Sequence, residues 1–229
     1  MRSTAKCSAP AVSSSLGELD SSEIGGLWFA SFVQEVVPVM MPVPRGNRWT
    51  ATDLDHLPEN GLRYEVLNGL LVVTAAPNLR HQLLIQGLGR ALDTALPPGH
   101  LTLPGVGVLI GADEPIPDLV AASGPIDWDA RGIPADQVKL VVEVVSRSTT
   151  LQDRMVKPVV YAEAGIPNYW RFEINSFKGQ LPGESLPVLF AHELGDDQAY
   201  ELTHRVSAGD TVTLHSPFEF AIDPGALLP

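Results

Sequence analysis

The pattern of apolar and polar positions becomes regular from about Trp49 onward and predicts alternating strands and helices. From 79 to 96, leucines and alanines recur at spacings of three and four, and Pro97-Pro98-Gly99 ends the pattern. This periodicity predicts an amphipathic helix. The run KLVVEVVS at 139–146 has no alternation, which is typical of a strand in a sheet covered on both faces. We expect a helix to follow from Thr149 or Thr150 to about Ala164, and then IPNYWRFEI to form a strand, which makes a βαβ unit.

Further strands are predicted on both sides of this unit. Asn68-Gly69 separates two β-rich runs, at about 62–67 and 70–74, and predicts a tight hairpin because both central residues of a type I′ turn need positive φ. Thr50, three residues before Asp53, predicts the N-cap of a short helix. The remaining strands are expected at about 106–110, 116–122, 187–193, 198–206, 211–214 and 218–222. The predicted fold is therefore an α/β domain with a central mixed sheet, helices on its faces and short antiparallel strands at the C-terminus.

The first 40 residues lack this regularity. They are rich in Ser and Ala and are followed by MMPVPRG, which resembles a linker. We therefore expect residues 1–40 to be a poorly ordered extension and residues 41–229 to be a single domain, with Met40 or Met41 as an alternative start. The N-terminal region of a signal peptide is positively charged, but this chain has Glu18, Asp20 and Glu23 there, which argues against secretion by that route.

Composition narrows the classes of function. The net charge is -12, and from Met41 onward there are 13 Lys and Arg against 23 Asp and Glu. An acidic domain argues against tight, non-specific DNA binding, so a nucleic-acid role would need a local basic patch. The single cysteine, Cys7, fits a reducing compartment, and we expect a cytoplasmic protein. The longest uncharged run near the N-terminus, 24–34, is too short to cross a bilayer, so no membrane association is expected.

Two carboxylates interrupt apolar strands and are the first candidates for chemistry. Glu143 shares its face of the strand with Val141 and Val145, and Asp118 lies between Ile116 and Val120 in the same way. An ionised carboxylate buried without a partner costs several kcal/mol, so each needs compensation. If the two strands are neighbours, both carboxylates can converge on one Mg²⁺, which prefers oxygen ligands. The alternative is that each carboxylate pairs with an arginine or a backbone amide.

The motif order then resembles a known family. Pro117-Asp118 followed by Glu143 in VVEVVS is similar to the PD-(D/E)XK nuclease superfamily, which has the restriction-endonuclease-like fold. The order RYEVLNGLLVV, NLRHQ, PDLV, VVEVVSRSTTLQDRMVK, YAEAGIPNYW resembles the Uma-two-type family of endonucleases over most of residues 49–223. This resemblance implies a metal site at Asp118 and Glu143 that binds Mg²⁺ or alternatively Mn²⁺.

The chain departs from the superfamily at Val145, where the motif has a lysine. In the resembled family the following helix supplies the basic residue, and the matching position is Lys157. The alternative is a surface ion pair of Lys157 with Asp153, four residues earlier. A helical wheel places Lys157 opposite Leu151, Met155 and Ala162, and Pro158 is expected to disturb the phase of the helix.

Two more residues have weaker claims. The resemblance implies that Glu65 of the RYE segment adds a carboxylate near the site, whereas the alternative is a strand residue that faces water or Arg63. His81 lies at the start of the long predicted helix, where it could touch substrate or could equally be solvated.

The prediction is a Mg²⁺-dependent endonuclease that hydrolyses phosphodiester bonds in DNA, with Asp118, Glu143, Lys157 and Glu65 as catalytic residues and a homodimer as a possible assembly. The alternatives are a catalytically degenerate binding or regulatory module with the nuclease fold, and a metal-dependent hydrolase of a smaller phosphate ester. Other chemistries lack support, because the chain has no HExxH, GxSxG or GxxxxGK[ST] motif.

Overall fold

A computed structural model describes residues 44 and 46–229 of the chain, so the predicted extension of residues 1–40 lies outside the described residues. The described part contains twelve strands, two α-helices, three short 3₁₀ helices and one π-helical segment. The strands are β1 (Arg63–Leu67), β2 (Leu70–Thr74), β3 (His100–Pro104), β4 (Gly107–Leu109), β5 (Leu119–Ser123), β6 (Gly132–Pro134), β7 (Val138–Val145), β8 (Asn168–Glu173), β9 (Val188–Leu194), β10 (Tyr200–Ser207), β11 (Val212–Leu214) and β12 (Phe220–Ile222). The helices are η1 (Ala51–His56), α1 (Leu79–Ala95), η2 (Ala135–Gln137), the π-helical η3 (Gln152–Val156), α2 (Lys157–Glu163) and η4 (Pro224–Leu227).

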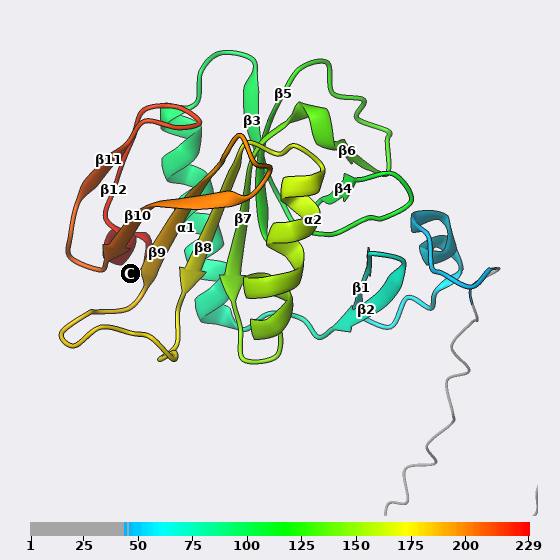
Figure 1. The fold of residues 1–229 in the computed structure, drawn as a ribbon, viewed down its shortest axis with the longest axis horizontal. Coiled ribbons are helices and arrows are strands. Elements are labelled where there is room, and N and C mark those ends of the chain that lie inside the picture. The colour runs from blue at the N-terminus through cyan, green and yellow to red at the C-terminus, as the bar shows by residue number, and fades with distance from the viewer. Residues whose placement is uncertain (1–43, 45) are drawn as a thin grey trace, which may run out of the picture. The chain divides into compact units, whose positions relative to one another are not determined.

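A six-stranded mixed sheet forms the centre of the domain (Figure 1), in the order β10-β9-β8-β7-β5-β3. Within this sheet, β7 and β8 are the one parallel pair, and the segment between them contains η3 and α2, so the predicted βαβ unit is present. The predicted neighbours are also adjacent, because β5 pairs antiparallel with β7. Near the C-terminus, β11 and β12 form a separate antiparallel pair, as the sequence predicts.

Both faces of this sheet are covered, which explains why β7 lacks alternation. Leu140, Val142 and Val144 pack with α1 in one hydrophobic cluster, whereas Val141 packs in a second cluster with Tyr161 of α2. The two helices therefore lie on opposite faces of the sheet (Figure 1). Glu143 points toward the α2 face, since its neighbours in sequence belong to the α1 face.

The hairpin of β1 and β2 turns at Asn68-Gly69, where both residues have positive φ, of 51° and 73°. This confirms the predicted turn. The sequence predicted β4, which lies within the expected strand at about 106–110, but it did not predict β6, the parallel pairing of β6 with β4, or β3, an edge strand whose HLTLP pattern ends in proline. Asp118 differs slightly from its predicted place, because it immediately precedes β5 instead of interrupting it.

The connection between β7 and β8 is less regular than predicted. Its helical segment includes the π-helical η3, in which the backbone N–H of Lys157 bonds to the carbonyl of Gln152, five residues earlier. Pro158 follows directly and has no N–H to donate to the turn before it, and the carbonyl of Asp153, five residues earlier, accepts a hydrogen bond from the Tyr169 hydroxyl instead. The helix ends at Glu163, and Gly165, two residues later, has a φ of 73°.

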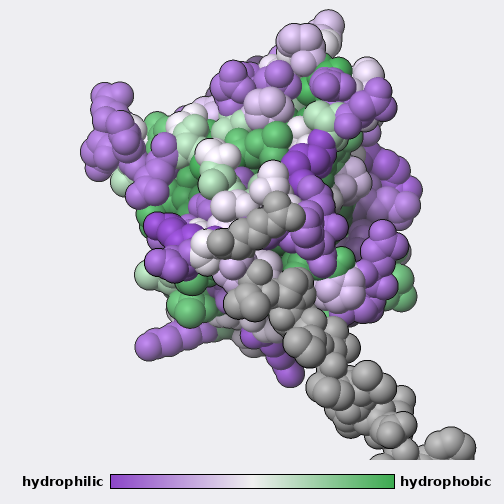
Figure 2. Space-filling model, turned by 90° about the vertical axis from the view of Figure 1, so that its right-hand side faces the viewer, coloured by the Kyte–Doolittle hydropathy of each residue, from purple (hydrophilic) through white to green (hydrophobic). Residues whose placement is uncertain are grey.

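The surface seen in Figure 2 is mixed, with hydrophilic side chains along much of its outline and hydrophobic ones between them. Within the described part of the chain, no helix is both long enough and apolar enough to cross a membrane.

Candidate active site

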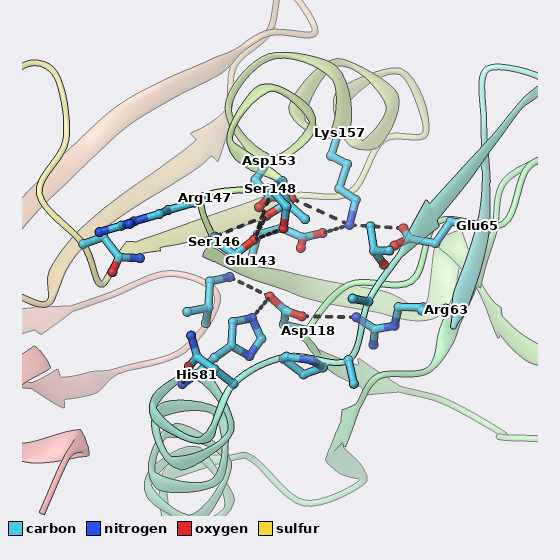
Figure 3. A pocket seen from close by; sticks show the side chains of 18 residues that line it. Arg63, Glu65, His81, Asp118, Glu143, Ser146, Arg147, Ser148, Asp153 and Lys157 are labelled. Atoms are coloured by element: carbon cyan, nitrogen blue, oxygen red, sulfur yellow. Dashed lines mark hydrogen bonds and ion pairs between the residues drawn. The ribbon is translucent and has the colours of Figure 1, made fainter. Parts of the chain in front are cut away.

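A single cavity of about 490 Å³ brings together all four residues that the sequence predicts for the site. Glu65 comes from β1, Asp118 from the residue before β5, Glu143 from the middle of β7 and Lys157 from the start of α2. Figure 3 shows these side chains pointing toward one another from four different elements. All of them are buried, with exposed fractions between 1% and 7%.

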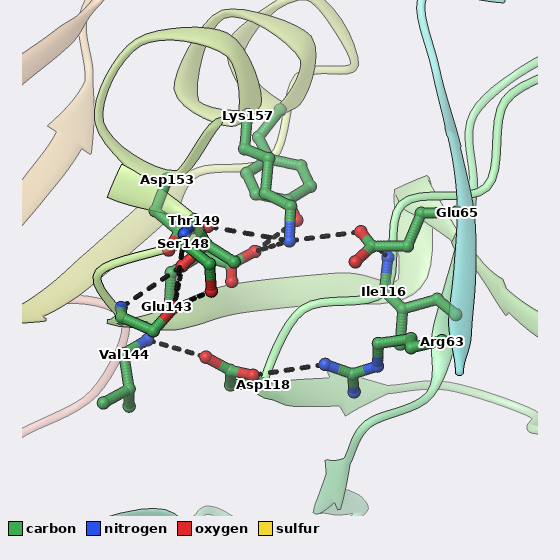
Figure 4. Close-up of polar contacts among 12 residues, drawn as sticks. Arg63, Glu65, Ile116, Asp118, Glu143, Val144, Ser148, Thr149, Asp153 and Lys157 are labelled. Carbon is green, nitrogen blue, oxygen red and sulfur yellow. Dashed lines mark hydrogen bonds and ion pairs between the residues drawn. The ribbon is translucent and has the colours of Figure 1, made fainter. Parts of the chain in front are cut away.

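Lys157 lies at the centre of the acidic part of this cavity. Its Nζ lies 3.0 Å from Oε1 of Glu143 and 3.1 Å from Oε2 of Glu65 (Figure 4). Asp153 is farther away, with its Oδ1 3.9 Å from the same nitrogen. The interpretation of Lys157 as the partner of Asp153 on a solvated surface is therefore wrong, because both residues are buried and the shorter contacts are to Glu143 and Glu65.

The π-helical turn explains how Lys157 reaches inward. A π-turn takes up an extra residue and so rotates the residues after it relative to a regular α-helix. Leu151 and Met155 are 65% and 64% exposed, while Lys157 is 4% exposed. The helix thus turns Lys157 toward the sheet and the side chains of Leu151 and Met155 toward the surface.

Asp118 occupies a different part of the cavity and has its own partners. Its Oδ2 accepts hydrogen bonds from the backbone N–H of Val144 at 2.8 Å and from Nε2 of His81 at 3.0 Å. Its Oδ1 lies 3.3 Å from the guanidinium of Arg63. The sequence-based alternative of an arginine and a backbone amide is therefore present for Asp118, together with its place in the shared cavity.

The hairpin and α1 supply these partners. Arg63 and Glu65 are two residues apart on β1, so they leave the same face of the strand and both point into the cavity. Glu65 is held by the backbone N–H of Ile116, which donates to Oε2 at 2.9 Å. The alternative that Glu65 faces water or Arg63 is therefore wrong. His81, in the first turn of α1, is 4% exposed, so of its two alternatives the solvated histidine is wrong.

The carboxyl groups outnumber the cations, and their pKa values follow from this and from burial. Burial raises the pKa of Glu143 well above its ordinary value, although the charge of Lys157 opposes the shift. Burial also raises the pKa of Asp153, to about 6. For Asp118, the effect of burial is outweighed by His81, Lys157 and the Val144 amide, so its pKa is lowered. Lys157 is buried, but the surrounding carboxylates raise its pKa and keep it charged.

Sequence reasoning did not identify Tyr161 as part of the site, and it considered Asp153 only as a surface partner. The Tyr161 hydroxyl donates a hydrogen bond to Oε1 of Glu143 at 2.7 Å. Asp153, Lys157 and Tyr161 are spaced four residues apart, so an i, i+4, i+8 pattern of polar residues in a buried helix was the available signal.

The donor set fits a small divalent cation in its chemistry. Four carboxylates face the cavity, while Lys157 and Arg63 are the cations in contact with them, which leaves excess negative charge. Carboxylate oxygens are the ligands that Mg²⁺ prefers. Both contacts of Glu143 fall on Oε1, and Oε2 has no hydrogen-bond partner among the described residues. No group of three or more His, Cys, Asp or Glu side chains in this part of the chain is already arranged to hold a metal ion.

Comparisons with known proteins identify the family and the fold of the chain. A family model named Uma2 and described as "Putative restriction endonuclease" matches residues 51–225, and it is the Uma-two-type family of the resemblance above. The fold is similar to the crystal structure of a protein from Anabaena variabilis that is described as a "putative nuclease". That match has a TM-score of 0.56 and 14% identity and covers 78% of this chain and 96% of the other, so it shows the restriction-endonuclease-like fold. A search of curated proteins found no match.

Proposed function

The chain belongs to the Uma2 family, and we propose that it is a divalent-metal-dependent endonuclease that hydrolyses phosphodiester bonds in DNA. The observation that carries the proposal is the position of Lys157. Its ammonium group is 3.0 Å from Glu143 although the strand has Val145 where the superfamily motif has lysine. A lysine from the following helix thus lies beside the strand carboxylate, where the resemblance expects a basic group.

Asp118 and Glu143 are the proposed ligands of Mg²⁺ or Mn²⁺. The bound ion would supply Lewis-acid charge that polarises the scissile phosphate. To bind it, Asp118 would exchange its contact with Arg63 for the ion, and Arg63 would then be available to the phosphate. Glu143 can use Oε2 while Oε1 stays with Lys157 and Tyr161.

Lys157 is proposed to orient the attacking water or to stabilise the negative charge that develops on the phosphate. An ammonium has three N–H donors, and two carboxylates lie within hydrogen-bond distance while Asp153 is farther away at 3.9 Å, so one donor remains for water or substrate. Glu65 is the proposed positioning residue for this ammonium, because the Ile116 amide fixes its carboxylate.

The rim of the cavity supports a phosphate substrate over a purely degenerate module. Arg63 and Arg147 both line the cavity, and Arg147 is exposed. A nuclease needs basic residues around its carboxylates to bind the phosphate backbone. A module without a polyanionic substrate has no need of them. The rival hydrolase of a smaller phosphate ester would use the same groups, so substrate tests must separate the two.

A nuclease assay tests the proposal with supercoiled plasmid, labelled oligonucleotides and a small phosphate diester, each with Mg²⁺, with Mn²⁺ and with chelator. We expect metal-dependent cleavage of DNA that falls by at least ~100-fold in Asp118→Asn, Glu143→Gln and Lys157→Met, since each removes a group proposed to act on the reacting phosphate. Glu114→Gln is the matched control, because Glu114 is also buried and is paired with Arg131 outside the cavity.

Two results would contradict the proposal. Equal activity in all three site variants would place the reaction elsewhere, and cleavage of the small diester alone would favour the rival hydrolase.

The proposed homodimer is to be tested separately by light scattering, with Met155→Gln as the variant because Met155 is 64% exposed on the outer face of the helix. The cytoplasmic location stays a prediction.

A further inference from the structure

A second group of charged side chains lies on the same face of the sheet as Glu143. It consists of four basic residues around two phenylalanines, and we call it the arginine cluster. It lines a shallow cavity of about 200 Å³. Its members are Arg154, Arg171, Lys178, Arg205, Phe177 and Phe190.

Strand register connects the cluster directly to the candidate active site. Glu143 of β7 is paired with Arg171 of β8, Arg171 with Phe190 of β9, and Phe190 with Arg205 of β10. These paired residues leave the same face of the sheet, so a straight row crosses four strands from the site to the cluster. The chain between β7 and β8 makes the same connection, since Asp153 lines the first cavity and Arg154 lines the second.

The cluster has more positive charge than its own carboxylates neutralise. Glu173 is paired with Arg154 through Nε at 2.8 Å, and Glu184 is paired with Arg205 at 2.7 Å. The four basic residues of the cluster thus face two carboxylates, which leaves an excess of two positive charges. Nε of Arg171 lies 3.3 Å from Glu173 but is buried without a hydrogen-bond partner among the described residues. This positive excess is local, because the whole chain has a net charge of -12.

The two phenyl rings hold the guanidinium groups in place. The guanidinium carbon of Arg171 lies 4.6 Å from the ring centre of Phe190, and that of Arg205 lies 4.9 Å from the same centre. Arg154 and Arg205 also lie over Phe177, at 5.6 and 5.8 Å. Stacking on an aromatic face leaves the in-plane N–H donors of a guanidinium group unobstructed. Glu173 and Glu184 occupy the Nε and Nη2 donors of Arg154 and Arg205, so Nη1 of each arginine remains for an anion. The arginine side chains are 16–27% exposed, so the cluster is reachable from solvent.

We propose that the arginine cluster binds a backbone phosphate of the nucleic-acid strand whose scissile phosphate lies in the active site. The inference rests on the proposed nuclease function and adds a second contact point to it. Three steps between neighbouring strands at ~4.8 Å separate Glu143 from Arg205 by ~14 Å. At ~3.4 Å of helix axis per nucleotide in a strand stacked as in B-DNA, the second phosphate lies about four nucleotides from the bond that is cleaved. The active site and the arginine cluster lie at the two ends of the same row of residues. A nucleic-acid strand can contact both with different phosphates, whereas a single small anion cannot, so nucleic acid is the favoured ligand.

Oligonucleotide binding tests the proposal in chelator, so that no cleavage takes place. Fluorescence anisotropy is measured on the full chain with labelled single strands of 4 and 20 nucleotides at several salt concentrations. We expect Lys178→Gln/Arg205→Gln to weaken binding of the 20-mer by about tenfold and to reduce the salt dependence by ~0.7 per lost phosphate contact. Binding of the 4-mer, which is too short to reach both points, should change far less.

The matched control is Lys139→Gln/Arg90→Gln, which removes the same charges. Arg90 is exposed on α1, across the sheet, and Lys139 lies in β7 four residues before Glu143. The single variant Lys178→Gln, at an exposed loop residue, replaces the double variant if the Arg205 change disturbs folding.

Unchanged 20-mer affinity and salt dependence in the cluster variants would overturn the cluster proposal alone. Absence of 20-mer binding in the wild type would overturn it together with the DNA substrate of the active site.

Discussion

The two charged groups on the α2 face of the sheet have opposite compositions. Around Lys157, one buried cation faces the carboxylates of Glu65, Glu143 and Asp153. Around Glu173, one buried carboxylate faces the guanidinium groups of Arg154 and Arg171. The first group therefore has negative charge in excess and is suited to a metal cation, whereas the second has positive charge in excess and is suited to phosphate. An acidic protein can thus keep a local site for a polyanion without a basic surface overall.

Removal of the central charge should be most damaging in the more deeply buried group. Lys157→Met leaves three buried carboxyl groups without their cation, so we expect a loss of ~3–5 kcal/mol in the free energy of unfolding and loss of nuclease activity. Urea denaturation followed by circular dichroism measures the first effect. Glu143→Gln in the Lys157→Met background should recover part of the stability, because it removes one unpaired acid. A variant as stable as the wild type would show that Lys157 does not neutralise this group.

The corresponding change in the arginine cluster is Glu173→Gln, and we expect a smaller effect. Its two arginine partners are partly exposed, at 23% and 16%, so water can replace some of the lost interaction. The expected destabilisation is ~1–3 kcal/mol. The positive excess rises at the same time, so binding of the 20-nucleotide strand should strengthen. Equal destabilisation by Glu173→Gln and Lys157→Met would mean that burial does not distinguish the two groups.

The smallest effect is expected at Tyr161, whose hydroxyl connects the helix to Glu143. Tyr161→Phe keeps the ring and removes one hydrogen bond, so it should cost ~1 kcal/mol of stability. Tyr200→Phe is the matched control, because its hydroxyl donates to the carbonyl of Ile166 at 2.7 Å, away from the cavity. Both variants should lose similar stability, but only Tyr161→Phe should lower the rate of DNA cleavage, since it alone holds a proposed metal ligand. Equal cleavage rates would remove Tyr161 from the site.

The sequence predicted those parts that depend on local signals. The Asn68-Gly69 turn, the long helix α1 and the paired strands of Asp118 and Glu143 follow from turn chemistry, periodicity and short connections. The edge strand β3 was missed although Leu101 and Leu103 alternate with polar residues directly after Pro97-Pro98-Gly99, because an alternation over five residues with two leucines is a weak signal. Family resemblance, not periodicity, pointed to Lys157, and a regular helical wheel could not place it because the preceding turn is π-helical.

The interaction partners of the site residues could not be predicted from the sequence. Whether Glu65 meets Arg63, water or Lys157 depends on how the hairpin packs against the chain beside β5, which no local pattern encodes. The same holds for the row from Glu143 to Arg205, since it exists only through the register of four strands. Register is a property of the folded sheet, whereas the sequence shows each strand by itself.

The location of the lysine on a helix instead of a strand has a consequence for heat inactivation. Each strand of the sheet centre is bonded on both sides, while Lys157 depends on a π-turn and a seven-residue helix. Short helices open by local fluctuations that leave a central sheet intact, and amide hydrogen exchange reports such openings. The charge of Lys157, to which we assign a catalytic role, would then leave the site at temperatures at which the sheet remains folded. The proposed activity would therefore be lost on heating before the fold is lost.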